Sequence, residues 1–314
     1  MTFAAIFPGQ GSQSVGMLVT LAERYTEVTD TFTEASDALD QDLWALVAAG
    51  PDDALNSTVN TQPVMVTAGV AAWRAWRAAG GTMPGIMAGH SVGEYTALIC
   101  AQSIDFAEGV TVVRERARLM QEAVPRGEGA IAAILGLSEE QVGAICTEAQ
   151  QGEVVSAVNF NSPQQTVIAG HVDAVERAMK LASEAGAKRA KLLPMSVPAH
   201  SALMRPAADG LSRALAGISV GPPIVPVIHN TDVATFDDPA AIVDTLSRQV
   251  CHPVRWTETI ARIVGENITT IVEFGPGKVL TGLNKRIDKS VQGICVQDPE
   301  SLDKALELAG EDAT

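Results

Sequence analysis

The stretch Gly-Ile-Met-Ala-Gly-His-Ser-Val-Gly-Glu, residues 85–94, decides the fold. Its first five residues are a short apolar run, which is typical of a buried strand, and helical patterning follows from residue 95. The pattern Gly-x-Ser-x-Gly therefore falls where a strand turns into a helix. Glycines on both sides allow the backbone to bend sharply there. We expect the hydroxyl of Ser91 to stand exposed above the sheet as a nucleophile.

Strands and helices alternate on both sides of this turn. The strand-like runs are residues 3–7, 85–89, 225–229 and 270–274, and the helical runs are residues 15–48, 64–79, 95–101, 106–122 and 242–250. Strands that alternate with helices predict a doubly wound α/β core with a parallel sheet.

The pattern changes after residue 125. The next 70 residues or so read, in order, as strand, helix, two strands around an Asn-Ser-Pro turn, helix and strand, which is the ferredoxin-like order. We expect residues 126–197 to form a small inserted lobe. Residues 1–125 and 198–314 would then form the catalytic core.

Composition and charge exclude several classes of protein. The 314 residues carry a formal net charge of −15, which disfavours binding to nucleic acid or to an anionic membrane. No apolar stretch reaches the ~18 residues of a membrane span, and the N-terminus has no basic segment typical of a signal peptide. Four widely spaced cysteines favour reduced thiols in a cytoplasmic protein. No cluster has metal-ligand spacing, so we predict neither a metal nor a bound cofactor.

A serine nucleophile needs a base, and the chain offers five histidines: His90, His171, His200, His229 and His252. His200 lies in a proline-shaped turn where the inserted lobe rejoins the core, and clefts form at such seams. The side chain of His90, next to Ser91 in a tight turn, is expected to point away from it. No acidic partner is evident, so a Ser–His dyad oriented by a backbone carbonyl is the favoured hypothesis.

Two further features bear on the site. The turn Gly9-Gln10-Gly11-Ser12 follows the first strand but lacks the Gly-Lys-Ser/Thr of a phosphate loop, and its N–H groups could instead stabilise an oxyanion. Arg114, Arg116 and Arg118 lie on one predicted helix, where residues two apart point in different directions. At most one of the three is expected to face a pocket beside Ser91, and the pattern does not choose among them.

Six motifs in register resemble the bacterial malonyl-CoA:acyl-carrier-protein transacylases of type II fatty acid synthesis. The motifs are Phe7-Pro8-Gly9-Gln10-Gly11-Ser12-Gln13, Gly89-His90-Ser91-Val92-Gly93-Glu94-Tyr95, Met120-Gln121-Glu122-Ala123, Asn159-Phe160-Asn161-Ser162-Pro163, Val197-Pro198-Ala199-His200 and Gly275-Pro276-Gly277-Lys278-Val279-Leu280. The resemblance runs from about residue 3 to residue 296. It implies a hydrolase-like α/β core with a ferredoxin-like lobe.

The resemblance also implies roles for individual residues. The implied roles are nucleophile for Ser91, base for His200, oxyanion-hole amides for Gln10 and Val92, carboxylate binding for Arg116, a backbone carbonyl that orients the base for Gln249, and pocket wall for Gln62 and Asn161. One departure is Val-Cys-His-Pro at residues 250–253, where the family would have an aromatic or small polar residue followed by Asn.

The implied reaction moves a malonyl group from a coenzyme A thioester to the phosphopantetheine thiol of an acyl carrier protein. Such carriers are acidic, and the candidate docking residues are Lys188, Arg189, Lys191, Lys278, Lys285 and Arg286. Three alternatives stay open: an acyltransferase serving a polyketide pathway or accepting methylmalonyl, a hydrolase with the same dyad, and a non-catalytic carrier-docking subunit. The presence of all the implied site residues disfavours the last.

Overall fold

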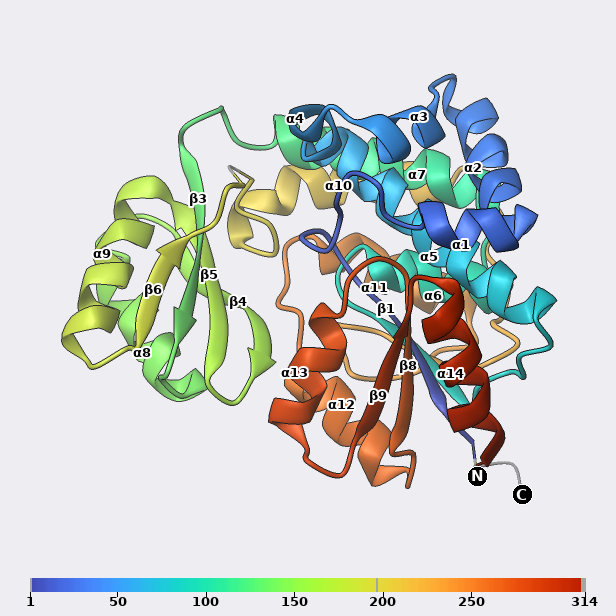
Figure 1. Cartoon of the computed structure of the whole chain (residues 1–314). Coiled ribbons are helices and arrows are strands. Elements are labelled where there is room, and N and C mark those ends of the chain that lie inside the picture. Colours follow the sequence, from blue (N-terminus) through green and yellow to red (C-terminus); the bar gives the residue numbers. More distant parts are fainter. Residues whose placement is uncertain (1, 196, 312–314) are drawn as a thin grey trace.

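The computed structural model describes residues 2–195 and 197–311. The chain forms a large lobe and a small lobe, each built around its own sheet (Figure 1). The large-lobe sheet is parallel and is covered by helices, whereas the small-lobe sheet is antiparallel. The α/β class predicted from the sequence is confirmed.

The large-lobe sheet has the strand order β7-β2-β1-β8-β9. Its strands are β1 (Ala4–Phe7), β2 (Ile86–Gly89), β7 (Val227–Ile228), β8 (Thr270–Phe274) and β9 (Gln292–Val296). The central strands are buried on both faces, which explains why they appear in the sequence as continuous apolar runs. The apolar pattern does not predict β9, because this edge strand is only partly buried.

Helices pack around this sheet, and most residues of the long helix α5 are buried. The large-lobe helices are α1 (Val19–Arg24), α2 (Thr26–Leu39), α3 (Leu43–Ala49), α4 (Asp52–Leu55), α5 (Thr58–Ala78), α6 (Gly93–Cys100), α7 (Phe106–Glu122), the 3-10 helix Ala202–Met204, α10 (Arg205–Leu215), α11 (Pro239–Gln249), α12 (Trp256–Gly265), α13 (Val279–Ile287) and α14 (Pro299–Glu311). Trp76 of α5 contacts Phe3 and Phe274 edge-on in the main apolar core. Among the described residues, no helix has the length and apolarity that crossing a membrane requires.

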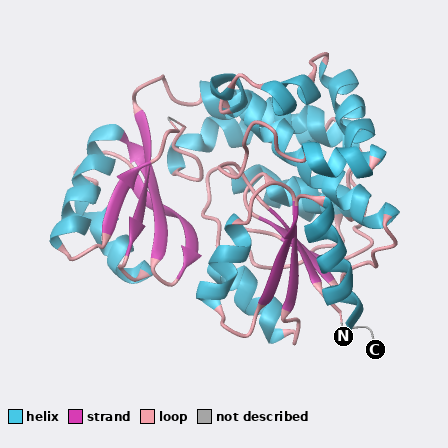
Figure 2. Cartoon of the chain, in the orientation of Figure 1, coloured by secondary structure: helices cyan, strands magenta, loops and turns pink. Residues whose placement is uncertain are grey.

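The small lobe has the element order predicted from the sequence. Its elements are β3 (Gly129–Leu135), α8 (Glu139–Ala149), β4 (Val155–Ser162), β5 (Gln165–His171), α9 (Val172–Glu184) and β6 (Arg189–Leu192), with the strand order β4-β5-β3-β6. Ser138 and Gln141 form a capping box that starts α8. Both helices lie on the side of the sheet that faces away from the large lobe (Figure 2).

Backbone hydrogen bonds join the two lobes. The Phe160 N–H of β4 donates to the Val254 carbonyl at 2.9 Å, and the Val254 N–H donates to the Val158 carbonyl at 2.9 Å. The free face of the small sheet is thereby held over the carboxyl edge of the large sheet.

Candidate active site

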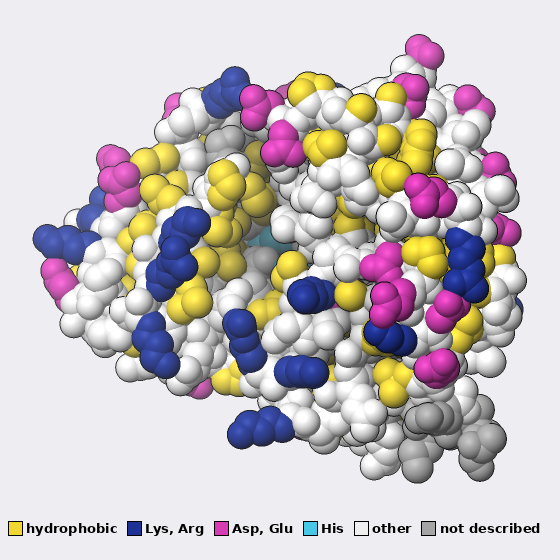
Figure 3. All heavy atoms as spheres, in the orientation of Figure 1, with side chains coloured by type: hydrophobic (Ala, Val, Ile, Leu, Met, Phe, Trp, Pro, Cys, Tyr) yellow, Lys and Arg dark blue, Asp and Glu magenta, His cyan; other side chains and the backbone are white. Residues whose placement is uncertain are grey.

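A cavity of about 160 Å³ lies where the carboxyl ends of the large-lobe strands face the small sheet. Because β1, β2 and β7 are parallel, the residues that follow them meet at one edge. The space-filling view shows the hollow between the lobes, with a histidine side chain inside it (Figure 3). The apolar part of its wall includes Ile131, Val167 and Met195 of the small lobe.

Ser91 occupies the sharp turn between β2 and α6 and has a positive φ of 53°. The turn needs both flanking glycines: a Cβ on Gly89 would lie 1.9 Å from the Gly93 carbonyl oxygen, and one on Gly93 would lie 2.2 Å from that of Phe7. Asn230, just after β7, braces the turn. Its Oδ1 accepts from the Ser91 N–H at 2.7 Å, and its Nδ2 donates to the Gly89 carbonyl at 2.6 Å.

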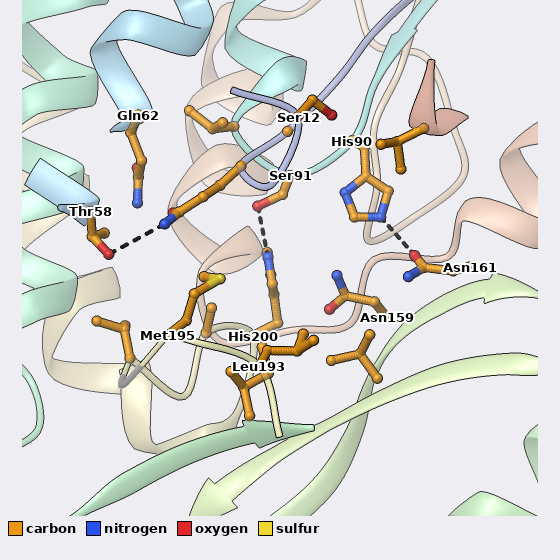
Figure 4. Close-up of a pocket in the computed structure, with 18 of the residues that line it drawn as sticks. Ser12, Thr58, Gln62, His90, Ser91, Asn159, Asn161, Leu193, Met195 and His200 are labelled. Carbon is orange, nitrogen blue, oxygen red and sulfur yellow. Dashed lines mark hydrogen bonds between the residues drawn. The ribbon is translucent and has the colours of Figure 1, made fainter. Parts of the chain in front are cut away.

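His200 points directly at Ser91 (Figure 4), with 2.8 Å between Nε2 and Oγ. Its Nδ1 lies 2.8 Å from the Gln249 carbonyl oxygen and 3.2 Å from that of His252. These carbonyls can only accept, so Nδ1 carries the proton and Nε2 is left to accept one from the serine. Burial, followed by the charge of Arg116, lowers the pKa of His200 to about 3. The imidazole is therefore neutral at neutral pH.

Arg116 of α7 is 1% exposed and reaches the same space. Its Nη1 donates to Gln62 Oε1 at 2.5 Å, and its Nη2 donates to Gln249 Oε1 at 2.9 Å and to Ser91 Oγ at 3.3 Å. Its Nε is buried and has no partner within the described residues. Burial lowers the pKa of this guanidinium. The site thus holds a buried cation beside the serine hydroxyl, and not all of its N–H donors have a partner.

The other two arginines of this helix point elsewhere. Arg114 donates to Gln41 at 2.5 Å, and Arg118 forms exposed pairs with Glu115 and Glu122. The helical spacing separates the three guanidinium groups, and of the three arginines it is Arg116 that lines the cavity.

Gln10 and Val92 line the cavity from the first turn and from the start of α6. Their backbone N–H groups donate to no acceptor in the described part of the chain. Asn161 lines the opposite side, and its Oδ1 lies 2.8 Å from His90 Nε2 (Figure 4). His90 points away from the Ser91–His200 pair, as expected, but still lines the cavity, and burial lowers its pKa.

Sequence reasoning missed two polar residues behind the site, Asn230 and Glu94. Glu94 is 0% exposed and accepts hydrogen bonds from His229 Nδ1, the Asn230 N–H and Gln249 Nε2, at 2.8, 2.9 and 2.8 Å. A weak signal existed for each. Glu94 directly follows the Gly-x-Ser-x-Gly turn, and Asn230 follows a buried strand at the carboxyl edge of the sheet.

The segment that departs from the expected pattern lies beside the base. Cys251 Sγ lies 3.4 Å from the Arg248 carbonyl oxygen, and His252 contributes its carbonyl to His200. All four cysteines are free, as expected. His171 accepts from the Val154 N–H in the small lobe at 2.9 Å, away from the cavity.

In a comparison with known protein families, residues 4–298 match the acyl transferase domain family. A serine nucleophile beside a histidine base is consistent with that match. The chain belongs to this family. One relative in the acyl transferase family is the malonyl CoA-acyl carrier protein transacylase of Salmonella typhimurium, 53% identical over 97% of this chain and 98% of that protein. A solved transacylase of the same name from Coxiella burnetii is 48% identical, covers 98% of both chains and has a TM-score of 0.97.

A third relative was solved with a partner. It is a malonyl-transacylase in complex with a type II PKS acyl-carrier protein, 52% identical over 98% of this chain and 99% of that one, with a TM-score of 0.97. The match to acyl transferase structures therefore spans both lobes of the chain.

Proposed function

We propose that this protein transfers a malonyl group from malonyl-CoA to the phosphopantetheine thiol of an acyl carrier protein. The observation that carries the proposal is the buried guanidinium of Arg116, which lies within 3.3 Å of the Ser91 hydroxyl and keeps unused donors. A nucleophile beside a buried cation suits an acyl group that ends in a carboxylate. Relatives at about half identity, named as malonyl transacylases, support the assignment.

In the first half-reaction, Ser91 attacks the thioester carbonyl carbon while His200 Nε2 takes the hydroxyl proton. The backbone amides of Gln10 and Val92 donate to the oxyanion of the tetrahedral intermediate, a contribution worth roughly 10²–10³ in rate for each donor. The C–S bond then breaks, and the departing thiolate of coenzyme A takes the proton from His200. The product is a malonyl ester on Ser91.

The second half-reaction repeats these steps in the opposite direction. The carrier thiol gives its proton to His200 and attacks the ester carbonyl. The intermediate collapses as the Ser91 oxygen leaves and recovers the proton, and the carrier departs as a malonyl thioester. Because coenzyme A leaves before the carrier reacts, the kinetics are ping-pong.

Arg116 selects the acyl group by binding its distal carboxylate through the planar guanidinium. Gln62 holds that guanidinium from one side, and Asn161 forms part of the wall towards the small lobe. The carboxylate also neutralises the charge that helps to lower the pKa of His200. Malonyl binding thus makes the base stronger, whereas an acetyl group leaves the buried cation unpaired.

We further propose that residues 1–125 and 198–314 act as the catalytic core and residues 126–197 as a lobe that helps to receive the carrier. Lysine and arginine side chains gather around the hollow in Figure 3. The exposed basic residues considered for docking are Lys188, Arg189, Lys191, Lys278, Lys285 and Arg286. An acidic carrier would approach a protein of net charge −15 through this local basic rim.

Intact mass after brief incubation with malonyl-CoA tests the function. We expect an adduct of about 86 Da, the mass of a malonyl ester, on the wild type and none on Ser91→Ala. Holo acyl carrier protein should then remove the adduct and gain the same mass. Loss of the adduct to water at an equal rate without carrier would indicate a hydrolase. No adduct from any acyl-CoA would indicate a non-catalytic docking subunit.

A polyketide carrier is the second candidate acceptor. The relative solved with a type II PKS acyl-carrier protein favours including it. Transfer rates to a fatty acid carrier and a polyketide carrier, measured side by side, distinguish the two.

A further inference from the structure

The mechanism does not use the buried carboxylate of Glu94. It is 0% exposed, and three donors surround it: His229 Nδ1, the Asn230 N–H and Gln249 Nε2. A carboxylate removed from water is costly unless it is fully hydrogen-bonded. The donor from Gln249 links this carboxylate to the site.

The side-chain amide of Gln249 connects Glu94 to Arg116. Its Nε2 donates to Glu94 Oε2 at 2.8 Å and to the Ser91 carbonyl at 3.0 Å, and its Oε1 accepts from Arg116 Nη2 at 2.9 Å. A carboxylate can only accept, and a guanidinium can only donate. The amide therefore has one orientation that satisfies both, because the flipped amide would place its NH₂ group against the guanidinium.

The other support of Arg116 is less firmly held. Gln62 accepts from Nη1, but its own amide nitrogen has only the Met120 sulfur, at 3.6 Å, as a recorded acceptor within the described chain. Thioether sulfur is a weak acceptor. The guanidinium thus depends on Gln249 for a support whose orientation is fixed.

We propose that Glu94 is a positioning residue: it fixes the amide of Gln249 and thereby aims Arg116 at the carboxylate of the acyl group. The inference rests on the proposed function, in which Arg116 binds that carboxylate. Glu94 acts through hydrogen-bond geometry, without touching the substrate.

Two variants of Glu94 distinguish loss of the hydrogen bond to Gln249 from a general loss of structure. In Glu94→Gln, the amide oxygen can still accept from Asn230 and Gln249. The amide nitrogen can donate to His229 Nδ1 once the ring proton moves to Nε2, an atom without a partner among the described residues. Glu94→Ala removes the acceptor. We expect the malonyl-to-acetyl ratio of kcat/KM to fall about ten- to a hundredfold in Glu94→Ala and to stay within about threefold in Glu94→Gln.

Gln249→Met and Glu273→Ala complete the set. Gln249→Met keeps the backbone carbonyl that contacts His200 but loses the amide bridge, so it should lower the ratio as Glu94→Ala does. Glu273 is a second glutamate that is 0% exposed, and it caps the start of α13. Its loss should reduce stability and leave the ratio unchanged. If Glu94→Ala does not fold, Gln249→Met decides the question.

If Glu94→Ala and Gln249→Met each lower the ratio by a similar factor, and the double variant lowers it no further, Glu94 acts on Arg116 through Gln249, as proposed. Three results would overturn it: a wild-type ratio in Gln249→Met, additive losses in the double variant, or an equal loss in Glu94→Gln. The variant Arg116→Ala distinguishes failure of this inference from failure of the proposed function. If the proposed function is wrong, Arg116→Ala leaves the ratio unchanged. If only the positioning role of Glu94 is wrong, Arg116→Ala still lowers the ratio.

Discussion

Replacing Arg116 with alanine is the sharpest test of acyl-group selection. A guanidinium has five N–H donors, and in the structure those on Nη1 and Nη2 bind Gln62, Gln249 and Ser91. We expect a substrate carboxylate to take two charge-assisted hydrogen bonds, from the second Nη1 donor and from the Nη2 donor that now contacts Ser91. Each charge-assisted hydrogen bond contributes about 1.5–3 kcal/mol, so two contribute about 3–6 kcal/mol. The malonyl-to-acetyl ratio of kcat/KM should fall roughly 10²- to 10⁴-fold.

The assay measures acyl transfer to holo carrier from malonyl-CoA and from acetyl-CoA with the same enzyme preparation. Arg118→Ala is the matched control, because this arginine lies on the same helix but forms exposed pairs with Glu115 and Glu122. The control should keep the wild-type ratio. A ratio in Arg116→Ala that stays within threefold of the control would refute the role of Arg116, whatever happens to the absolute rates.

Three more perturbations test other parts of the site. Asn230→Ala should slow malonyl and acetyl transfer in equal proportion, because its two hydrogen bonds brace the Ser91 turn and not the acyl group; a selective loss in steady-state rates would contradict this role. The pKa of His200 is about 3 in the fold against about 6.5 unfolded, so the unfolded chain binds a proton that the folded protein does not. Stability should therefore fall as the pH decreases from about 6.5 towards 3, and denaturant titrations of His200→Gln should show a pH slope smaller by about one proton. Added salt should raise the KM for the carrier more than the KM for malonyl-CoA, and Lys285→Glu should weaken that dependence; equal effects on both KM values would exclude steering by the basic rim.

The fold could be predicted where local pattern and burial agree. Residues 85–94 contain a buried strand, a turn that requires glycine at positions 89 and 93, and a helix start, so the pattern predicts the position of Ser91. Strand β9 was missed because an edge strand is partly exposed and lacks a continuous apolar run.

The site could be predicted only in part. Spacing showed that a single arginine of α7 could face the pocket, but choosing Arg116 required a resemblance or a structure. The contact of Glu94 with Gln249 joins positions 155 residues apart, and neither periodicity nor a motif encodes such a pair. The same holds for Asn230, whose brace on Ser91 depends on how β7 and β2 pair.

The hydrogen bonds between β4 and Val254 affect how coenzyme A and the carrier can enter the cavity. They anchor the small lobe beside the cavity, so the lobe is poorly suited to swing open as a lid between the two half-reactions. We therefore expect coenzyme A and the pantetheine arm of the carrier to use the same entrance in turn. Free coenzyme A would then occupy the path of the incoming carrier and compete with it for the malonyl-enzyme.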